Sequence, residues 1–284
     1  METGGAVIAS SGSIEAVGTR FVGNSADADA GALHVLGNSN ASLTDCSLEQ
    51  NSAYTGGAVF VSANSSLTML RGAAHNNSAT VGGAIAGSAA ATLQLQAVSL
   101  TRNSATVGGA VAAYAADVTL NLTRAADNAA AAGADSASTV DFGVPVMAGV
   151  GGALYLRSST LTALNCTLSR NSAHQHGGAL YLERTALAEL RHSQLAGNRA
   201  GGRGGAIKVA NALPKMRASD NHYLNNSATS GGAWAAAAED LPADLFLREE
   251  LFAGNEATSG DGGAVAVTGG FLAEMQEQLQ QHLP

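Results

Sequence analysis

The chain has 284 residues, a formal net charge of −8 and 46% hydrophobic residues, while aromatic residues make up only 4% of it. Its two lysines, Lys208 and Lys215, and its arginines form no basic stripe along the sequence. Because proteins bind phosphate backbones through clustered lysine and arginine, nucleic acid is excluded as a partner. No apolar run reaches the roughly 20 residues that a membrane-spanning helix needs, so no transmembrane segment is predicted.

One octapeptide, Asn-Ser-Ala-Thr-Val-Gly-Gly-Ala, occurs twice without change, at 77–84 and 103–110. Its Gly-Gly-Ala end returns along the whole chain, mostly at steps of 26 or 27 residues. A fixed period of this size is the signature of a stacked repeat, whose units bury their apolar side only against their neighbours. We expect the glycines to form turns that need positive φ or close approach of the backbone. The glycines at the second position of each triplet are Gly5, Gly31, Gly57, Gly83, Gly109, Gly152, Gly178, Gly205, Gly232 and Gly263.

A column of asparagines follows the same period. We expect each side-chain amide to bond to the backbone and to the equivalent amide of the next unit, forming a structural ladder. Asparagine also tolerates left-handed turn geometry, so we expect these residues themselves to occupy it. The predicted ladder consists of Asn24, Asn51, Asn77, Asn103, Asn128, Asn171, Asn198, Asn226 and Asn255.

Apolar residues have fixed places within each unit. They lie ten, eight and three positions before the asparagine, as at Leu67, Met69 and Ala74, and a short apolar run such as Ala58–Val61 follows the glycines. Alternation of apolar and polar residues is strand periodicity, and no stretch of a unit is periodic enough for a helix. We therefore predict an all-β fold over residues 1–270. It is a single-stranded parallel β-helix of about nine to ten turns of ~26 residues, with two clear strands and a short third in each turn.

Leucine-rich repeats have a comparable period and also carry an asparagine after apolar residues. That repeat needs a large aliphatic residue five positions before the asparagine, where the first seven units of this chain have Thr, Cys, Gly, Val or Ser. It also needs a helix or a 3₁₀ turn where this chain has Gly-Gly and a strand. We therefore reject this alternative.

The longest departure from the period lies between Asn128 and Gly152, which are 24 residues apart where other units need 6 to 8. Insertions in solenoids emerge as loops on one face, often the binding face. We predict a surface insertion loop over about 129–150, and a smaller one at Glu239–Asp244.

Beyond Gly270 the pattern changes. Apolar residues recur every four positions, which predicts an amphipathic helix over 271–284 that covers the last turn. These apolar residues are Phe271, Met275, Leu279 and Leu283. At the other end, Met1 leads directly into Gly4-Gly5-Ala6 without a signal peptide. We therefore expect the chain to be part of a longer protein.

The two cysteines, Cys46 and Cys166, each lie five residues before a ladder asparagine. Because they share a phase but lie several turns apart, they are too distant for a disulfide. We predict two buried free thiols in one core column.

Two motifs alternate in fixed phase along the chain. Gly-Gly-Ala followed by Ile, Leu or Val appears at Gly4, Gly56, Gly82, Gly108, Gly151, Gly177, Gly204 and Gly262. Phe-x-x-Asn appears strictly at Phe21–Asn24 and Phe252–Asn255, with Leu, Tyr or Ala replacing Phe elsewhere. Up to Gly270 the chain therefore resembles the repeat of chlamydial polymorphic outer-membrane proteins. The resemblance implies a right-handed parallel β-helix that serves as the surface-exposed passenger of an autotransporter, implicated in adhesion.

Parallel β-helices also include polysaccharide lyases and hydrolases, whose sites need two or three carboxylates on one face or a calcium cluster. Several aspartates occupy different phases of the repeat, so we expect no such convergence and no catalytic residues. They are Asp45, Asp117, Asp127 and Asp220, with Asp27 and Asp29 in a turn and Asp240 and Asp244 in a loop.

His174 and His176 lie in one turn, and Arg203 lies in the matching turn of the next unit. Two ligands without a nearby third do not make a zinc site, so we interpret these histidines as solvated and predict no metal. No phosphate loop or nucleotide motif is present, and we predict no cofactor.

Six Asn-x-Ser/Thr sequons could carry glycans if the protein is secreted by a eukaryote. Asparagine and serine are abundant, so composition alone accounts for about half of them. The sequons start at Asn40, Asn64, Asn76, Asn121, Asn165 and Asn225.

The leading functional hypothesis is a non-enzymatic, surface-exposed or secreted β-helix for adhesion or recognition, with a surface protein or a carbohydrate as partner. The first alternative is a carbohydrate-active β-helix, a polysaccharide lyase or hydrolase, with its site near the 129–150 loop. A third hypothesis, ice binding through a flat face, is based on a broken column of threonines. This column holds Thr80, Thr106, Thr229 and Thr258, with Ala173 and Ala200 interrupting it.

Overall fold

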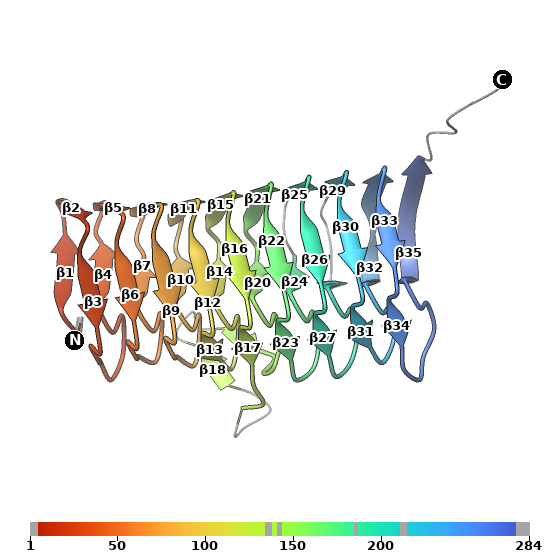
Figure 1. Ribbon diagram of the computed structural model, residues 1–284, viewed down its shortest axis with the longest axis horizontal. Coiled ribbons are helices and arrows are strands. Elements are labelled where there is room, and N and C mark those ends of the chain that lie inside the picture. Colours follow the sequence, from red (N-terminus) through yellow and green to blue (C-terminus); the bar gives the residue numbers. More distant parts are fainter. Residues whose placement is uncertain (1–4, 134–137, 141–143, 185–186, 211–214, 277–284) are drawn as a thin grey trace.

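The computed structural model describes residues 5–133, 138–140, 144–184, 187–210 and 215–276, and these residues form one parallel β-solenoid of about nine turns (Figure 1). Strands of successive turns pair in parallel, with equivalent residues opposite each other, as Leu67 is opposite Leu93. No helix occurs among the described residues. The predicted all-β parallel coil is therefore confirmed.

The largest sheet takes two strands from each turn. The first strands follow the glycine pairs: β1 (Val7–Ser10), β4 (Leu33–Leu36), β7 (Val59–Val61), β10 (Ile85–Ser88), β14 (Val111–Tyr114), β20 (Leu154–Arg157), β24 (Leu180–Glu183) and β28 (Ile207–Ala210). The second strands are β2 (Ser13–Val17), β5 (Asn40–Thr44), β8 (Ser66–Leu70), β11 (Thr92–Gln96), β15 (Asp117–Asn121), β21 (Thr160–Leu164), β25 (Leu187–Arg191) and β29 (Lys215–Ser219). In the last two turns the two strands are continuous, as β32 (Trp234–Arg248) and β35 (Val265–Gln276).

Two smaller parallel sheets complete the coil. The third strands are β3 (Arg20–Val22), β6 (Ser47–Glu49), β9 (Ala73–His75), β12 (Ser99–Thr101), β16 (Arg124–Ala126), β22 (Thr167–Ser169), β26 (Gln194–Ala196), β30 (His222–Leu224) and β33 (Leu251–Ala253). A fourth, two-residue strand that the sequence did not reveal follows most ladder asparagines. These strands are β13 (Ser104–Ala105), β17 (Ala129–Ala130), β23 (Ser172–Ala173), β27 (Arg199–Ala200), β31 (Ser227–Ala228) and β34 (Glu256–Ala257).

The main core fills the interior of the coil. The predicted apolar columns point inward, so that Leu67, Met69 and Leu93 are completely or almost completely buried. Burying one such side chain contributes roughly 1.5–3 kcal/mol. Residue sizes are matched across the interior. For example, a Cβ added to Gly72 would lie only 3.2 Å from the terminal methyl carbon of Met69. The core is therefore packed between columns as well as along them.

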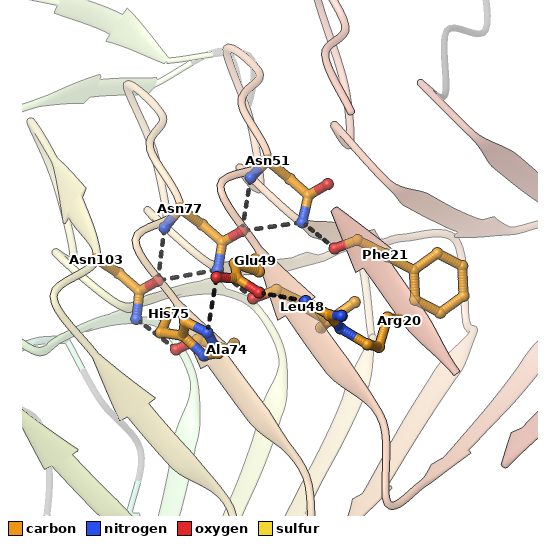
Figure 2. A network of polar contacts seen from close by, with 9 residues as sticks. All are labelled: Arg20, Phe21, Leu48, Glu49, Asn51, Ala74, His75, Asn77 and Asn103. Carbon is orange, nitrogen blue, oxygen red and sulfur yellow. Dashed lines mark hydrogen bonds and ion pairs between the residues drawn. The ribbon is translucent and has the colours of Figure 1, made fainter. Parts of the chain in front are cut away.

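The asparagine ladder, Asn24 to Asn255, joins the turns along one corner of the coil, and Figure 2 shows Asn51, Asn77 and Asn103 of it. Asn77 donates to Oδ1 of Asn103 from its backbone N–H and from Nδ2, both at 3.0 Å. Nδ2 of Asn77 also donates to the backbone oxygen of Leu48 at 2.9 Å. Oδ1 of Asn77 accepts the same pair of bonds from Asn51. Each buried amide of the ladder is hydrogen-bonded as predicted.

The left-handed geometry lies one residue earlier than predicted. The ladder asparagines themselves do not have positive φ, whereas the residue before each of them does, as at Gln50 (φ 55°) and Arg102 (φ 56°). This sharp bend turns the following asparagine inward, where its amide reaches the next turn. The exposed position before it needs only a residue that tolerates φ > 0, so its side chain varies.

The glycine pair combines both predicted reasons for glycine. The first glycine has positive φ, as at Gly56 (φ 63°). The second approaches the next turn so closely that a Cβ on Gly57 would overlap the carbonyl oxygen of Gly83. This close stacking makes the corner of the coil intolerant of any side chain at that position.

Cys46 and Cys166 are buried and free, as predicted. Each thiol faces backbone oxygens of its surroundings, for example the oxygen of Thr44 at 3.3 Å from Sγ of Cys46. Burial raises the pKa of Cys166, which keeps this thiol protonated.

The C-terminal part differs from the prediction in two places. Phe271–Gln276 belong to strand β35 and not to a helix; residues 277–284 of the predicted helix lie outside the described residues. A repeat of four also fits the alternation of a strand, and pairing with β32 provides the backbone partners that select the strand. Glu239–Asp244, predicted as a smaller insertion loop, are assigned to β32, but the pairing with β35 is interrupted between Ala238 and Ala243, where β32 has three more residues than β35.

The interior near the C-terminal end is aromatic and polar. Trp234 and Tyr223 are completely buried and meet edge to face, with ring centroids 5.6 Å apart. Tyr223 also stacks on Phe252 at 4.7 Å. Nδ2 of Asn221 donates to Oε1 of Glu250 at 3.1 Å, and burial raises the pKa of Glu250 to about 7. The last turns therefore contain a carboxyl group that is costly to ionise.

Asn103→Ala should destabilise the chain by about 2–4 kcal/mol, because it leaves the donors of Asn77 and the backbone oxygen of Ala74 buried without partners. Urea unfolding followed by circular dichroism measures the effect. The exposed neighbour Ser104→Ala should change stability by less than about 0.5 kcal/mol. Equal effects of the two substitutions would show that the ladder does not hold the turns together.

The C-terminal turns should be about 1–3 kcal/mol less stable at about pH 8 than at about pH 5. The folded protein keeps the Glu250 proton up to about pH 7, whereas the unfolded chain releases it near its ordinary pKa of about 4.3. Fluorescence of Trp234, the one tryptophan of the chain, reports unfolding of this end. Glu250→Gln should remove the pH dependence, and Glu249→Gln, at an exposed site beside it, should preserve it.

Candidate functional site

The segment in which the insertion was predicted leaves the coil, but the two ends of that segment pair with neighbouring turns. Ala129 and Ala130 still form strand β17, and Val150 already bridges Val107 and His176 of the neighbouring turns. Between these points lies an antiparallel hairpin of β18 (Ser138–Val140) and β19 (Val144–Val146). The excursion therefore occupies the place that the single residue Thr106 has in the preceding turn.

A second apolar cluster lies outside the coil, beside this excursion. It is separate from the interior core and includes Val107 and Val150 with Ala112 and Tyr155 of the first strands. The valines belong to the chain between the asparagine and the glycines. This segment covers the outward face of the first strands, so side chains that would otherwise be solvated are buried there.

In the three turns that follow the excursion, this covered face becomes polar. Several of these polar side chains belong to β20, β24 and β28, and one, His176, belongs to the segment that precedes β24. We call this group of side chains on the covered face the outer cluster. Tyr155 is opposite Tyr181, which is opposite Lys208, and Arg157 is opposite Glu183. The outer cluster consists of Tyr155, Arg157, His176, Tyr181, Glu183 and Lys208.

Glu183 accepts two contacts within the outer cluster. The Tyr155 hydroxyl donates to Oε2 of Glu183 at 2.9 Å, and Nε of Arg157 lies 3.8 Å from Oε1. The Tyr155 and Tyr181 rings stack with centroids 5.7 Å apart. Burial, and then the negative charge of Glu183, raise the pKa of Tyr155, so this hydroxyl stays a hydrogen-bond donor and is no general base.

His176 is held in one neutral form. Its Nδ1 accepts a hydrogen bond from the backbone N–H of Arg203 at 2.9 Å, so Nε2 carries the proton. Burial lowers the pKa of His176 to about 4, and the charges of Lys208 and Arg203 add to this effect. The imidazole therefore remains a neutral hydrogen-bond donor at physiological pH. Its ring stacks on that of Tyr181, with the ring centroids 6.4 Å apart.

His174 and His176 do not form part of a metal site within the described residues. No group of three or more histidine, cysteine, aspartate or glutamate side chains is close enough there to hold a metal ion. His176 is half buried against Tyr181, which corrects our interpretation of a solvated side chain, whereas His174 is exposed. His174 and His176 therefore have different surroundings, although they are only two residues apart in the sequence.

Two of the aspartates considered for catalysis pair with an arginine of the next turn. Asp45 binds Arg71, and this hydrogen bond lowers the pKa of Asp45. Asp127 binds Arg170 in the same manner. Figure 2 shows another surface link between turns, in which Arg20 contacts Glu49 at 3.1 Å. Exposed pairs of this kind contribute little to stability.

The sequons lie on turns and strand ends. Five of the six asparagines are exposed: Asn40, Asn64, Asn76, Asn165 and Asn225. Asn121 differs, because its Oδ1 is buried and the hydroxyl of Thr123 in the same sequon donates to the backbone oxygen of Leu95. The five exposed asparagines are accessible from solvent, whereas Asn121 is partly buried.

The threonines of the ice-binding hypothesis do not form one free array. The hydroxyls of Thr229 and Thr258 donate to the backbone oxygens of Gly201 and Ala228. The insertion follows Thr106 and interrupts the column. The more regular exposed hydroxyl and amide groups lie on the second strands, at Thr68, Gln94, Thr119 and Thr162.

Comparison with protein-family models, with curated proteins and with solved structures finds no match for this chain. In the described part of the chain, no helix is long and apolar enough to cross a membrane. The resemblance to the polymorphic outer-membrane protein repeat therefore depends on the two motifs and on the parallel β-solenoid that they form.

The sequence search did not identify the outer cluster, although a signal was present. Ala153-Leu-Tyr-Leu-Arg157 and Ala179-Leu-Tyr-Leu-Glu183 are the same pentapeptide up to its last residue, which changes sign. In the register of a solenoid, this repeat places one tyrosine opposite the other and the arginine opposite the glutamate. Strand alternation pointed these residues outward, and only the structure shows that the outward face is covered.

A double-mutant cycle with Tyr155→Phe and Glu183→Gln should give a coupling energy of about 1 kcal/mol, because the two side chains share a part-buried hydrogen bond. Each single substitution should destabilise the chain by about 1–2 kcal/mol in urea unfolding. Strict additivity of the two effects would mean that this bond contributes nothing to the outer cluster.

Proposed function

We propose that the chain is a non-enzymatic recognition module of a secreted or surface-exposed protein, binding a surface protein or a carbohydrate. One observation carries the proposal: the longest insertion and the outer cluster lie at the same corner of an otherwise regular coil. Departures from a repeat that cost stability are retained where they serve binding. The resemblance to polymorphic outer-membrane proteins supports adhesion and a place at the cell surface.

A carbohydrate-active enzyme is the second candidate, and Glu183 beside the insertion favours it. Hydrolysis of a glycosidic bond uses two carboxyl groups about 5–9.5 Å apart. Among the described residues, the outer cluster contains one carboxylate, that of Glu183, which already accepts contacts from Tyr155 and Arg157. Its geometry therefore supports holding a ligand better than hydrolysing one.

Residues 131–149 can be replaced by a single threonine, the residue that occupies this place as Thr106 in the preceding turn. We expect the shortened chain to keep its circular dichroism spectrum, because long surface loops add little to stability. We also expect it to lose binding to immobilised glycans and matrix proteins that the intact chain recognises.

As a control, Thr68→Ala combined with Gln94→Ala alters exposed side chains on β8 and β11 and should preserve binding. Unchanged binding of the shortened chain would overturn the proposal. Release of reducing ends or unsaturated products from pectin or alginate by the intact chain, abolished in Glu183→Gln, would establish the enzymatic alternative instead.

A further inference from the structure

The first and last turns of the coil are edges whose strands have one neighbour each. Among the described residues, β1, β2 and β3 pair only with β4, β5 and β6, respectively. In the same way β33, β34 and β35 pair only with β30, β31 and β32. Figure 1 shows these two edges at opposite ends of the coil. The backbone groups on the outer side of each edge are therefore available to a further strand.

The apolar interior is open at both edges. In the third-strand column, Leu48 and Leu100 are completely buried, whereas Phe21 in the first turn and Phe252 in the last turn are partly exposed. A further turn stacked on either edge would remove this apolar surface from water. Partly exposed side chains that pack against the interior core all belong, among the described residues, to the first and last turns: Val7, Ile14, Ala16, Phe21, Phe252 and Val265.

The asparagine ladder ends in complementary groups. Oδ1 of Asn51 accepts hydrogen bonds from Asn24 of the preceding turn, but Oδ1 of Asn24 itself has no donor among the residues that the structure describes. At the other end, Nδ2 of Asn255 donates to the backbone oxygen of Tyr223. The second Nδ2 proton and the backbone N–H of Asn255 have no acceptor within the described part of the chain. Contact between unlike ends would join these donors to that acceptor, whereas contact between like ends would not.

The two end turns have compatible lengths. The first and second strands begin six residues apart in the first turn, at Val7 and Ser13, and the matching positions in the last turn, Val265 and Leu272, are seven apart. Turns with this difference already stack in the coil, because β10 and β11 begin seven residues apart and β14 and β15 begin six apart. A second copy of the chain can therefore continue the coil in register.

We propose that the last turn of this chain binds the first turn of a second copy, so that copies join head to tail. The backbone N–H and Nδ2 of Asn255 donate to Oδ1 of Asn24 in the second copy. Phe252 stacks on Phe21 of that copy, as Tyr223 stacks on Phe252 within the chain. The contact joins two different surfaces, so each dimer retains one free end of either kind and can grow. This inference is independent of the proposed recognition function, which a single copy can perform.

Sedimentation velocity of the full chain over a range of protein concentrations tests the proposal. We expect dimers, trimers and longer species whose average mass rises steadily with concentration, because a head-to-tail contact does not close. A contact between like ends would instead stop at a dimer.

Gly263 allows one end to be blocked while the fold is retained. A Cβ on Gly232 would overlap the carbonyl oxygen of Gly263, whereas a Cβ on Gly263 meets, among the described residues, only the backbone oxygen of Asn255 at 3.7 Å. Gly263 has no positive φ, so alanine fits its backbone. In the proposed contact this Cβ would overlap the carbonyl oxygen of Gly5 of the second copy.

Gly263→Ala should therefore keep the circular dichroism spectrum and the unfolding midpoint of the unchanged chain, and weaken association at least about tenfold. Gly232→Ala, the same substitution one turn earlier, should destabilise the fold itself, because its Cβ has no space within the chain. Gln94→Ala, at an exposed position on β11 in the middle of the coil, should leave association unchanged.

A mixture of two variants identifies which surfaces meet. Ala16 is partly exposed in the first turn, so Ala16→Glu keeps its carboxylate in water in a single copy and would bury it in the contact. Circular dichroism checks that this variant is folded. Ala16→Glu and Gly263→Ala should each stay monomeric alone, because each lacks one of the two surfaces. Mixed together they should form a one-to-one dimer and nothing longer.

The inference is overturned if the unchanged chain stays monomeric at every concentration, or if Gly263→Ala associates as strongly as the unchanged chain. Dimers formed by either folded variant alone would show that like ends meet, which also contradicts it. So would the absence of dimers in the mixture of the two folded variants. None of these results affects the proposed function, which is judged by ligand binding of the chain that lacks residues 131–149.

Discussion

The structure depends on one recurring interaction, the hydrogen bonds of each ladder asparagine to the turns before and after it. Each amide accepts from the asparagine of one neighbouring turn and donates to that of the other, as Asn103 does between Asn77 and Asn128. A buried amide without these partners would cost about 1–3 kcal/mol. The bonds exist only when successive turns are parallel and in register, so the ladder selects that stacking over a slipped one.

The register fixed in this way determines where variation can occur. Inward positions must match in size from turn to turn, and the second glycine of each pair except the last has no space for a Cβ. Outward positions are under no such constraint. They are brought into columns whatever their chemistry, which is how Tyr155 comes to lie beside Tyr181 and Arg157 beside Glu183. A solenoid can thus assemble a site from residues that are 26 positions apart without changing its backbone.

The segment between asparagine and glycine connects the architecture with the candidate site. It covers the outward face of the first strands, and its length is free to change because it is not part of the interior core. In one turn it expands into the excursion that ends at Val150. The outer cluster follows in the next strands, where the same segment contributes His176 in place of valine. Burial of polar groups at this corner lowers the stability of the fold, as is common at binding sites.

The repeat period by itself determined the coil, the ladder, the turn glycines and the interior columns, because each is a pattern along one chain that stacking copies unchanged. Tertiary structure decided what depended on contacts between elements. Phe271 and Met275 fit a helix and a strand equally well, and pairing with β32 selected the strand. The left-handed bend falls before the asparagine because the amide has to face inward. The side chains of the outer cluster are buried only because the neighbouring segment covers them, and no pattern within one strand reveals what lies above that strand.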